Sequence, residues 1–464
     1  MKRLVSDRQS ISTAGAAVVV IIVIIVAAVA AVVFLSSPGT STTSSSSTPR
    51  TITITFGATL SLTGNLMAFG VEQNWTLNKA VADINAFGGI PLQNGSHALV
   101  KLIVLDDQSK PTIGQSNLQT LATTDHATVI LGELGGVQDS VAQSFSSANQ
   151  IPYIGPVYIS QFKTCAGSCS NAWIFSPFEN ETNEAHIFLN WFKTVVTPSS
   201  SVKISFFSET GDPAAQANTG AGEAYATQLG YAVCTCSDTS FTPLSQSEMT
   251  AFIQGAKTSN VTAIYGLPLP PDAVMMVNTA KANGFTPKAW LMTRGTAVAP
   301  FSVIGLGGLG NLSSGVMSAF PWQPAVPYTG MLFGHNESNP VLVGDYEAVF
   351  HHPPTLEGVY YTEALVAADA IAAASNLTNV AIRQALRTGT FQTPMGVVNF
   401  TPGGQWVQSE ADILLMQWQI IGGGPSAIQA LQILEPTSIA TTSYLIYPFT
   451  YWNSTSTQQT RPWP

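Results

Sequence analysis

Short apolar runs alternate with longer mixed stretches at the start of the folded part of this sequence. Residues 52–58 and 99–105 are two such runs, and their length and composition predict buried β-strands. Between them, a glycine-bearing turn at residues 61–65 leads into a stretch that ends in A-F-G-G-I at residues 86–90, which predicts a helix. A strand–helix–strand unit of this kind opens a parallel sheet, and such sheets present their ligands at the carboxyl ends of the strands.

The same alternation continues along the chain. It predicts further strands at residues 128–132, 151–155, 202–207, 231–235, 263–266 and 289–292. It predicts helices at residues 138–150, 215–230, 246–259 and 271–284, and a long alanine-rich helix from residue 357 to about residue 375. Strands and helices in turn indicate a doubly wound α/β fold with right-handed crossovers. Because these strands are too many for one compact sheet, we expect two lobes.

Charged side chains are scarce in this chain of 464 residues, 45% of which are hydrophobic. They make up 9% of the chain, about a third of the share usual in globular proteins. The 17 basic and 26 acidic residues give a net charge of −9, which argues against nucleic acid as a partner. Ser, Thr, Asn and Gln must therefore supply much of the polar surface that faces water. Such an exterior suits an extracellular protein in an acidic medium, where carboxylates take up protons.

Nine N-x-[S/T] sequons offer a second source of surface polarity. Chance and the Ser-, Thr- and Asn-rich composition explain part of this number, so it stays open whether several carry glycans. The candidate asparagines are Asn74, Asn94, Asn180, Asn260, Asn311, Asn336, Asn376, Asn399 and Asn453. Mass spectrometry of the native protein, searched for glycopeptides, tests this prediction.

The first 50 residues predict a membrane anchor followed by a tether. Residues 14–35 are 22 residues without a charge, and as a helix they span about 33 Å, enough for the hydrocarbon core of a bilayer. Three basic residues precede this run, so the positive-inside rule places residues 1–13 in the cytoplasm and the folded body outside the cell. A long secretory signal cut near residue 28 is the alternative. Residues 36–50 are a Ser/Thr-rich linker with nothing to bury.

Four cysteines occur as two close pairs, Cys165 with Cys169 and Cys234 with Cys236. Outside the cell they should be oxidised. A disulfide between Cys165 and Cys169 closes a short loop that contains glycine, and we favour this pair. Cys234 and Cys236 share one face of a predicted strand, where a bridge is possible but strained. A Cys₄ zinc site is the alternative, but the spacings are not C-x₂-C and nothing brings the two pairs together.

No catalytic or metal-binding motif stands out. The segment G-L-G-G-L-G at residues 305–310 matches the dinucleotide-binding pattern, but neither a helix nor an acidic residue about 20 positions on follows it, so we interpret it as a surface loop. The sequence lacks nucleophile-elbow, zinc-protease and phosphate-loop motifs. Its six histidines are scattered, at His97, His126, His186, His335, His351 and His352. We therefore expect a binding protein that uses no cofactor and no metal, rather than an enzyme.

Four segments resemble one protein family. They are L-S-L-T-G-N-L-M-A-F-G at residues 60–70, A-D-I-N-A-F-G-G-I at 82–90, D-D-Q-S-K-P at 106–111 and T-P-M-G-V-V-N-F-T-P-G-G at 393–404. They are similar to segments of the branched-chain amino-acid-binding proteins, the solute receptors of one class of ABC importer. The resemblance covers roughly residues 51–420 and implies the type I periplasmic-binding fold, in which a three-strand hinge joins two Rossmann-like lobes. It implies lobe 1 at residues 51–177 and 321–409, lobe 2 at 178–320 and 410–452, and a tail at 453–464.

The resemblance also implies a ligand site in the cleft between the lobes. By alignment, lobe 1 contributes Phe69, Leu134, Gly135, Gly136, Val157, Tyr158 and Ile159. The other expected contacts are Asp212, Leu269 and Arg294 from lobe 2, and Glu357 at the start of the alanine-rich helix.

Two departures from the family pattern affect the expected ligand. Gly135 and Gly136 offer only backbone N–H groups where the family commonly has hydroxyl groups for the ligand carboxylate. Arg294 stands in the neighbourhood where the family has an acid for the ligand ammonium group, and an arginine there should attract an anionic group instead. Glu357 is then the candidate for the missing negative charge. An amide, a carboxylic acid or a peptide-like solute is therefore as plausible as an amino acid.

Together these patterns predict a monomeric, membrane-tethered extracellular solute-binding protein that delivers its ligand to an ABC-importer permease. A ligand-sensing domain without a transport role is one alternative. A surface hydrolase and a structural surface glycoprotein are alternatives from other classes.

Overall fold

The first apolar runs form the centre of a sheet. In the computed structural model, β1 (Thr51–Leu60) pairs in parallel with β3 (His97–Asp106) over its whole length. On its other side β1 pairs in parallel with β4 (Val129–Leu131). Helix α2 (Met67–Ala86) follows β1 and packs against both β1 and β3. The strand–helix–strand unit predicted from the sequence is therefore confirmed.

The structure describes residues 50–132, 134–158, 173–209, 212–235, 245–421, 428–451 and 460–462. The predicted anchor at residues 14–35, Ile159 and three of the four cysteines lie outside the described residues. Cys234 is described and takes part in a disulfide. None of the helices in the described ranges has the length and apolar character needed to cross a membrane.

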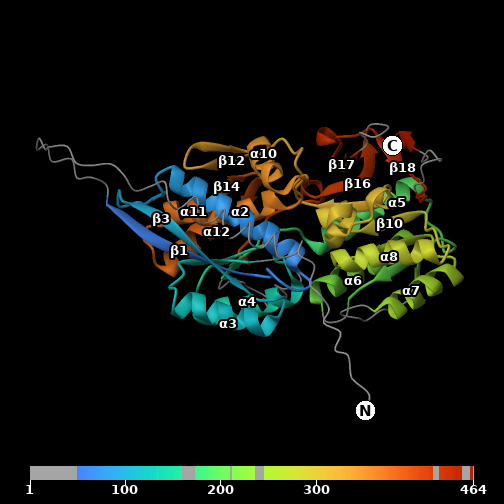
Figure 1. Cartoon of the computed structure of the whole chain (residues 1–464), viewed down its shortest axis with the longest axis horizontal. Coiled ribbons are helices and arrows are strands. Elements are labelled where there is room, and N and C mark those ends of the chain that lie inside the picture. Colours follow the sequence, from blue (N-terminus) through green and yellow to red (C-terminus); the bar gives the residue numbers. More distant parts are fainter. Residues whose placement is uncertain are drawn as a thin grey trace, which may run out of the picture. The chain divides into compact units, whose positions relative to one another are not determined.

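Lobe 1 is built on a sheet that, in the described residues, has six strands in the order β2-β3-β1-β4-β5-β6. Its remaining strands are β2 (Ile90–Pro91), β5 (Tyr153–Ile154) and β6 (Ile174–Phe175). Its helices are α2, α3 (Pro111–Thr123), α4 (Gly136–Asn149), α10 (Asn339–Phe350), α11 (Glu357–Ala373) and α12 (Asn379–Thr388). Figure 1 shows α2 and α11 on one side of this sheet, with α3 and α4 on the other.

Lobe 2 is built on a second sheet, with the order β17-β16-β11-β10-β9-β7-β8 among the described residues. The strands are β7 (Lys203–Phe207), β8 (Ala232–Cys234), β9 (Ala263–Gly266), β10 (Ala289–Met292), β11 (Met317–Phe320), β16 (Leu414–Ile421) and β17 (Ile428–Glu435). The helices are α5 (Glu181–Val195), α6 (Pro213–Leu229), α7 (Gln246–Thr258), α8 (Pro270–Ala282) and the short α9 (Ala299–Ser302). Strands β8, β7, β9, β10 and β11 pair in parallel, whereas β16 and β17 extend the sheet in antiparallel fashion.

Helices cover both faces of the lobe 2 sheet, which explains why its central parallel strands β9 and β10 are apolar at nearly every position. Ile204 and Phe206 of β7 belong to a core that includes α5, whereas Phe207 and Ile264 belong to the core that includes α7 and α8. Successive residues of a strand point to opposite faces, so a parallel strand covered on both sides must be apolar at nearly every position.

Shorter elements complete the chain. Three two-stranded pairs are formed by β12 (Thr329–Leu332) with β13 (His335–Ser338), β14 (Thr390–Thr393) with β15 (Gly396–Asn399), and β18 (Tyr444–Ile446) with β19 (Thr460–Pro462). The 3₁₀ helices are η2 (Arg294–Thr296), η3 (Ile304–Leu306), η4 (Gly310–Ser313), η5 (Glu410–Asp412) and η7 (Thr437–Ile439). Residues 305–310, which match the dinucleotide-binding pattern, fall in η3 and η4 and the turn between them, so no long helix follows them.

Three segments that connect the two sheets lie against one another. Ser176, just after β6, forms an isolated parallel bridge with Gln405. The side-chain amide of Gln408 donates to the Phe178 carbonyl at 3.2 Å. The Phe178 ring lies 5.5 Å from the ring of Phe320, at the end of β11. The lobes are therefore connected through one packed region, while the exact domain boundaries stay a prediction.

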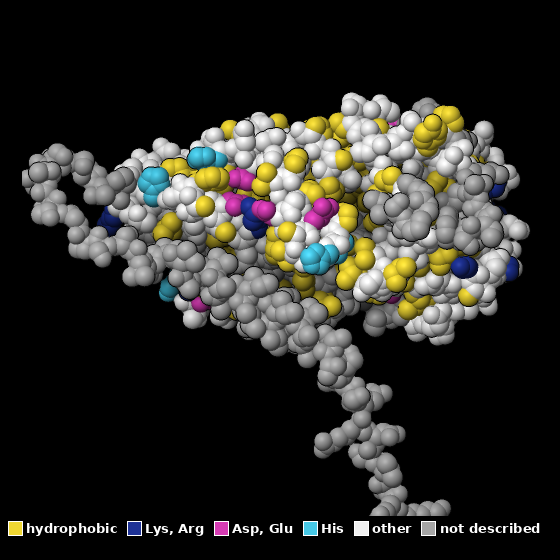
Figure 2. All heavy atoms as spheres, turned by 45° about the horizontal axis from the view of Figure 1, so that its top comes forward, with side chains coloured by type: hydrophobic (Ala, Val, Ile, Leu, Met, Phe, Trp, Pro, Cys, Tyr) yellow, Lys and Arg dark blue, Asp and Glu magenta, His cyan; other side chains and the backbone are white. Residues whose placement is uncertain are grey.

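Charged groups are unevenly divided between the surface and the interior. On the face drawn in Figure 2, charged side chains form a few small groups among hydrophobic and uncharged polar ones. Among the described residues, ten acidic side chains are buried, but Arg294 is the one buried base. The buried acids are Glu72, Asp107, Glu179, Glu181, Glu184, Glu209, Asp212, Asp272, Glu357 and Glu363. An interior with so many acids and so little positive charge must hold several of them as neutral carboxylic acids.

Candidate functional site

The residues expected to bind ligand lie at the ends of strands and the starts of helices. Leu134 and Gly135 connect β4 to α4, and Gly136 is the first residue of α4. Val157 and Tyr158 follow β5. In lobe 2, Asp212 and Leu269 are the N-cap residues of α6 and α8, and Arg294 opens η2 directly after β10. Phe69 lies in the first turn of α2, and Glu357 is the first residue of α11.

These side chains are buried. Phe69, Tyr158 and Glu357 have no exposed area, and Arg294 is 1% exposed. Leu134, Val157, Asp212 and Leu269 are also buried. Leu134 and Tyr158 of lobe 1 and Leu267 and Leu269 of lobe 2 belong to one continuous apolar cluster. The structure therefore shows the lobes in contact, with the predicted site covered.

Tyr158 of lobe 1 lies within the electrostatic influence of Arg294 of lobe 2. The Tyr158 ring packs edge-on against Phe178 at 5.0 Å. Burial, and then the charges of Glu179 and Glu184, raise the pKa of the Tyr158 hydroxyl well above its usual value, while the Arg294 charge acts in the opposite direction. The phenol is therefore a neutral group near a guanidinium of the other lobe.

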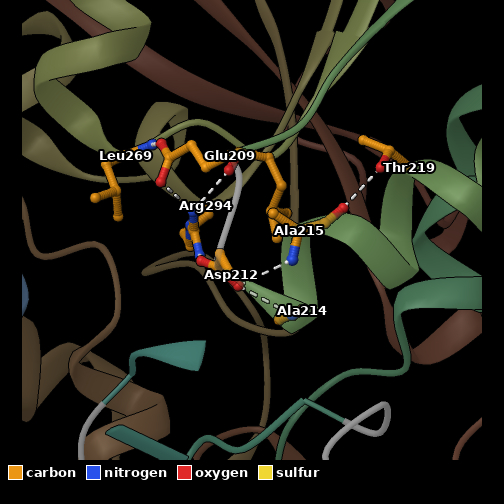
Figure 3. A network of polar contacts seen from close by, with 8 residues as sticks. Glu209, Asp212, Ala214, Ala215, Thr219, Leu269 and Arg294 are labelled. Atoms are coloured by element: carbon orange, nitrogen blue, oxygen red, sulfur yellow. Dashed lines mark hydrogen bonds and ion pairs between the residues drawn. The ribbon is translucent and has the colours of Figure 1, made fainter. Parts of the chain in front are cut away.

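The Arg294 guanidinium is held inside lobe 2 (Figure 3). Its Nη1 donates to Asp212 Oδ2 at 2.5 Å, and its Nη2 donates to the Leu267 carbonyl at 2.7 Å. Glu209 Oε2 lies 3.6 Å from Nη2. Neighbouring carboxylates raise the pKa of Arg294 against the effect of burial, so the guanidinium stays charged. Its charge is balanced by carboxyl groups of its own lobe.

The two carboxyl groups beside Arg294 each hold the start of a helix. Asp212 Oδ1 accepts hydrogen bonds from the backbone N–H groups of Ala214 and Ala215, both at 3.0 Å. With Pro213 at the next position, Asp212 gives α6 a strong start signal, and the helix accordingly begins at Pro213 rather than at the predicted residue 215. Glu209 Oε1 accepts from the N–H of Leu269, whose own side chain offers no cap to α8.

A second acidic group lies where the chain first crosses between the lobes. Glu179 and Glu184 are buried, and the Asn218 amide donates to Glu184 Oε2 at 3.2 Å. Burial, and then the charge of Glu181, raise the pKa of Glu184 to about 8, although Thr293 and Arg294 act against the shift. The pKa of Glu179 is also raised by burial and by its acidic neighbours. Neither residue was among the predicted contacts, although an acidic run at residues 179–184 of so charge-poor a chain could have drawn attention.

Glu357 is hydrogen-bonded within lobe 1. Its Oε2 accepts from the backbone N–H groups of Thr355 at 2.6 Å and Leu356 at 2.9 Å. Burial raises its pKa to about 7, against the effect of these hydrogen bonds. Glu72 of α2 lies close enough for the charge of Glu357 to raise its pKa further, after burial. Whether Glu357 contacts a ligand stays a prediction.

Two small pockets lie among the described residues. One lies at the crossing segments and is lined in part by Val157, Ser176, Glu179 and Gln405. Glu179 has no hydrogen-bond partner for either carboxyl oxygen within the described part of the chain. Nowhere in that part do three His, Cys, Asp or Glu side chains form a group suited to a metal ion.

Comparisons with known proteins identify the family and the fold of this chain. Residues 53–425 match the family model described as periplasmic binding protein. Among solved structures, a leucine binding protein LivK from Thermotoga maritima is 18% identical, with a TM-score of 0.66 over 82% of this chain and 98% of that one. LivJ from Streptococcus pneumoniae, solved with isoleucine, is 17% identical, with a TM-score of 0.63 over 82% and 99% of the two chains.

A third similar structure has a different kind of ligand. It is a solute binding protein of an ABC transporter from Rhodopseudomonas palustris in complex with 3,4-dihydroxybenzoic acid. That protein is 15% identical, with a TM-score of 0.60 over 82% of this chain and 96% of that one. At these identities the likeness shows the fold, and the predicted type I periplasmic-binding fold is confirmed.

Proposed function

Since this chain belongs to the periplasmic binding protein family, we propose that it is the extracellular solute receptor of an ABC importer. It captures a small solute between its two lobes and passes it to a permease. The observation that supports this most directly is that strand-end residues of both α/β lobes, Tyr158 and Leu269 among them, belong to one apolar cluster. Ligands of open parallel sheets bind at this edge, where helix N-termini also gather.

The ligand contacts come from both lobes. Lobe 1 contributes Phe69, the backbone N–H groups of residues 134–136 and the loop at residues 157–159. Lobe 2 contributes the loop ends around Asp212, Leu269 and Arg294, whose guanidinium is engaged within its own lobe, and Glu357 supports the site from the start of α11. Because the side chains of these residues that the structure describes, such as Phe69, Tyr158 and Arg294, are buried, the lobes must separate before a solute enters, and the ligand then favours the closed form.

The solute class is small amino-acid-like, amide or carboxylate compounds. Similar folds hold isoleucine in one case and 3,4-dihydroxybenzoic acid in another, so the fold itself accepts both aliphatic and aromatic ligands. A receptor that must release its cargo is expected to bind with a dissociation constant in the micromolar range, about −8 kcal/mol.

A thermal-shift screen of the full chain tests the proposal. The probes are leucine, isoleucine, 3,4-dihydroxybenzoate, short amides and short peptides. A ligand at 100 times its dissociation constant stabilises the folded state by about 2.7 kcal/mol, which raises the melting temperature by a few degrees. Recovery of the hit chemically unchanged supports a receptor, whereas its breakdown supports the hydrolase alternative. A broad library without any hit contradicts the proposal.

The N-terminal segment forms the membrane tether in this proposal. Residues 14–35 stay in the bilayer as a helix, and the Ser/Thr-rich linker gives the folded body freedom to move above the membrane. Membrane fractionation followed by mass spectrometry of the N-terminal peptide tests this. A mature chain that starts near residue 28 contradicts the anchor and supports a cleaved signal. The same sample, searched for glycopeptides, tests the nine sequons.

A further inference from the structure

Arg294 directs its hydrogen bonds into lobe 2 rather than towards lobe 1. Its two terminal nitrogens donate to Asp212 and to the Leu267 carbonyl, and the side chain is 1% exposed. The close carboxylate balances its charge. A guanidinium engaged in this way has little attraction left for an anionic solute, although the sequence alone suggested that role.

The contacts of Arg294 reach two helix starts and one loop. Asp212 holds the first turn of α6, and Glu209, 3.6 Å from the guanidinium, holds the N–H of Leu269 at the start of α8. The Leu267 carbonyl belongs to the loop between β9 and α8. We call residues 212–215, 267–269 and 294–295 the lobe 2 rim. All three parts of the rim follow parallel strands of the same sheet, at the edge where the ligand is expected.

The backbone of the lobe 2 rim is also tightly packed. Arg294 has φ +52°, a left-handed conformation that residues other than glycine rarely adopt. The Gly295 N–H donates to the Pro268 carbonyl at 2.9 Å, and a Cβ added to Gly295 would lie 2.4 Å from that oxygen. Such a conformation persists only where its surroundings hold it in place, and it recurs at functional sites.

We propose that Arg294 is a positioning residue, which joins the three parts of the lobe 2 rim into one rigid half of the binding site and does not itself bind the solute. The flat guanidinium reaches Asp212 and the Leu267 carbonyl at the same time, whereas a lysine ammonium is a single point of charge. Recognition by lobe 2 then depends on the groups that the rim presents. The inference about the solute rests on the proposed function, but the inference about the rim does not.

Hydrogen–deuterium exchange of the full chain without any ligand tests the rim directly. In Arg294→Lys we expect the amides of Ala214, Ala215 and Leu269 to exchange at least 10-fold faster than in the wild type. The amides of β1 in lobe 1 should keep their wild-type rates. The matched control is Arg387→Lys on α12 of lobe 1, which should leave the rim unchanged. Wild-type exchange at the rim of Arg294→Lys would overturn the proposal.

Asp212→Asn provides a second test that works even if Arg294→Lys does not fold. The asparagine oxygen still caps α6, but the charged partner of Arg294 is gone. Because Asp212 makes no hydrogen bond to Leu269, faster exchange at Leu269 in this variant requires transmission through Arg294. We expect that increase, and its absence contradicts a joined rim.

Calorimetric titration with leucine, isoleucine and 3,4-dihydroxybenzoate separates positioning from direct binding. If Arg294 positions the rim, Arg294→Lys should weaken each bound probe by a similar factor, and the weaker binding should accompany the faster exchange. If Arg294 instead binds an anionic group, lysine should retain part of the affinity while exchange stays at the wild-type rate, which overturns the proposal. If no probe binds the wild type, the proposed ligand class is in error, while the exchange experiment still decides the role of Arg294.

Discussion

Lobe 2 and lobe 1 each bury carboxyl groups beside helix starts, but only lobe 2 supplies a cation for them. In lobe 2, Asp212 forms a close ion pair with Arg294, and Glu209 lies on the other side of the same guanidinium. In lobe 1, Glu72 lies close to Glu357, and neither forms an ion pair with a basic side chain in the described residues.

The difference determines how each lobe tolerates its buried acids. Arg294 gives the Asp212 carboxylate a partner, so a charged group can serve as the cap of α6. Burial raises the pKa of Glu357 to about 7, and it raises that of Glu72 together with the Glu357 charge. The lobe 1 pair is therefore held by protons. Lobe 2 holds Asp212 by an ion pair, although burial also raises the pKa of its Glu184 and Glu209 to about 8.

Removal of the cation should have the largest effect on stability. We expect Arg294→Met to lower the free energy of unfolding by about 3–5 kcal/mol, because a buried carboxylate loses its partner. Urea unfolding at pH 7 measures this. The exposed Lys288→Met in the same lobe should change it by about 0.5 kcal/mol or less. Equal effects of the two substitutions would show that the Arg294 network contributes little.

Raising the pH should weaken the folded state by about 3 kcal/mol or more. Glu357 and Glu184 have pKa values of about 7 and about 8 in the folded chain, against 4.5 when exposed. The folded state therefore binds more protons than the unfolded state between pH 4.5 and 8, so stability falls as pH rises through that window. Melting temperatures should be highest near pH 4.5 and lower at pH 8. A rise from pH 5 to pH 8 would contradict the raised pKa values of these two buried acids.

Substitution of one acid of the lobe 1 pair should reduce this pH dependence. In Glu357→Gln the amide oxygen still accepts from Thr355 and Leu356, but the group no longer titrates. We expect little change in stability at pH 5 and a gain of about 2 kcal/mol over the wild type at pH 8. Parallel urea titrations at both pH values measure it. The exposed Glu347→Gln on α10 is the control and should follow the wild type.

The smallest effect is expected where a helix of lobe 2 caps itself. Helix α7 begins with a capping box in which Ser245 accepts from the Glu248 N–H and Glu248 accepts from the Ser245 N–H. Ser245→Ala should cost about 1 kcal/mol, and Ser245→Asp should restore most of it. The cost should add to that of Arg294→Met within about 0.5 kcal/mol, since the sites are independent. A strong departure from additivity in urea unfolding would mean that the rim extends to α7.

Local sequence determined much of the fold. Strands β9 and β10 have the predicted bounds. A short apolar run that ends at turn residues indicates a buried parallel strand and locates its ends to within a few residues. The start of α6 was placed two residues late because the Asp212–Pro213 cap signal was not used. The motifs at residues 60–70 and 106–111 pointed to the family, and the match over residues 53–425 bears this out.

The partners of the buried charges were decided only by the tertiary structure. Arg294 was expected to face a solute, but the partner that balances it lies 82 positions earlier in the chain. Glu357 lies close to Glu72, which is separated from it by most of lobe 1 and all of the lobe 2 sheet from β7 to β11. The periodicity of apolar residues indicates the secondary structure of a segment. The protonation state of an ionisable group depends instead on the distant groups that the fold brings beside it. The sequence by itself determined the lobes and the family of this protein, and the packing of the strand ends decided which groups lie beside its buried charges.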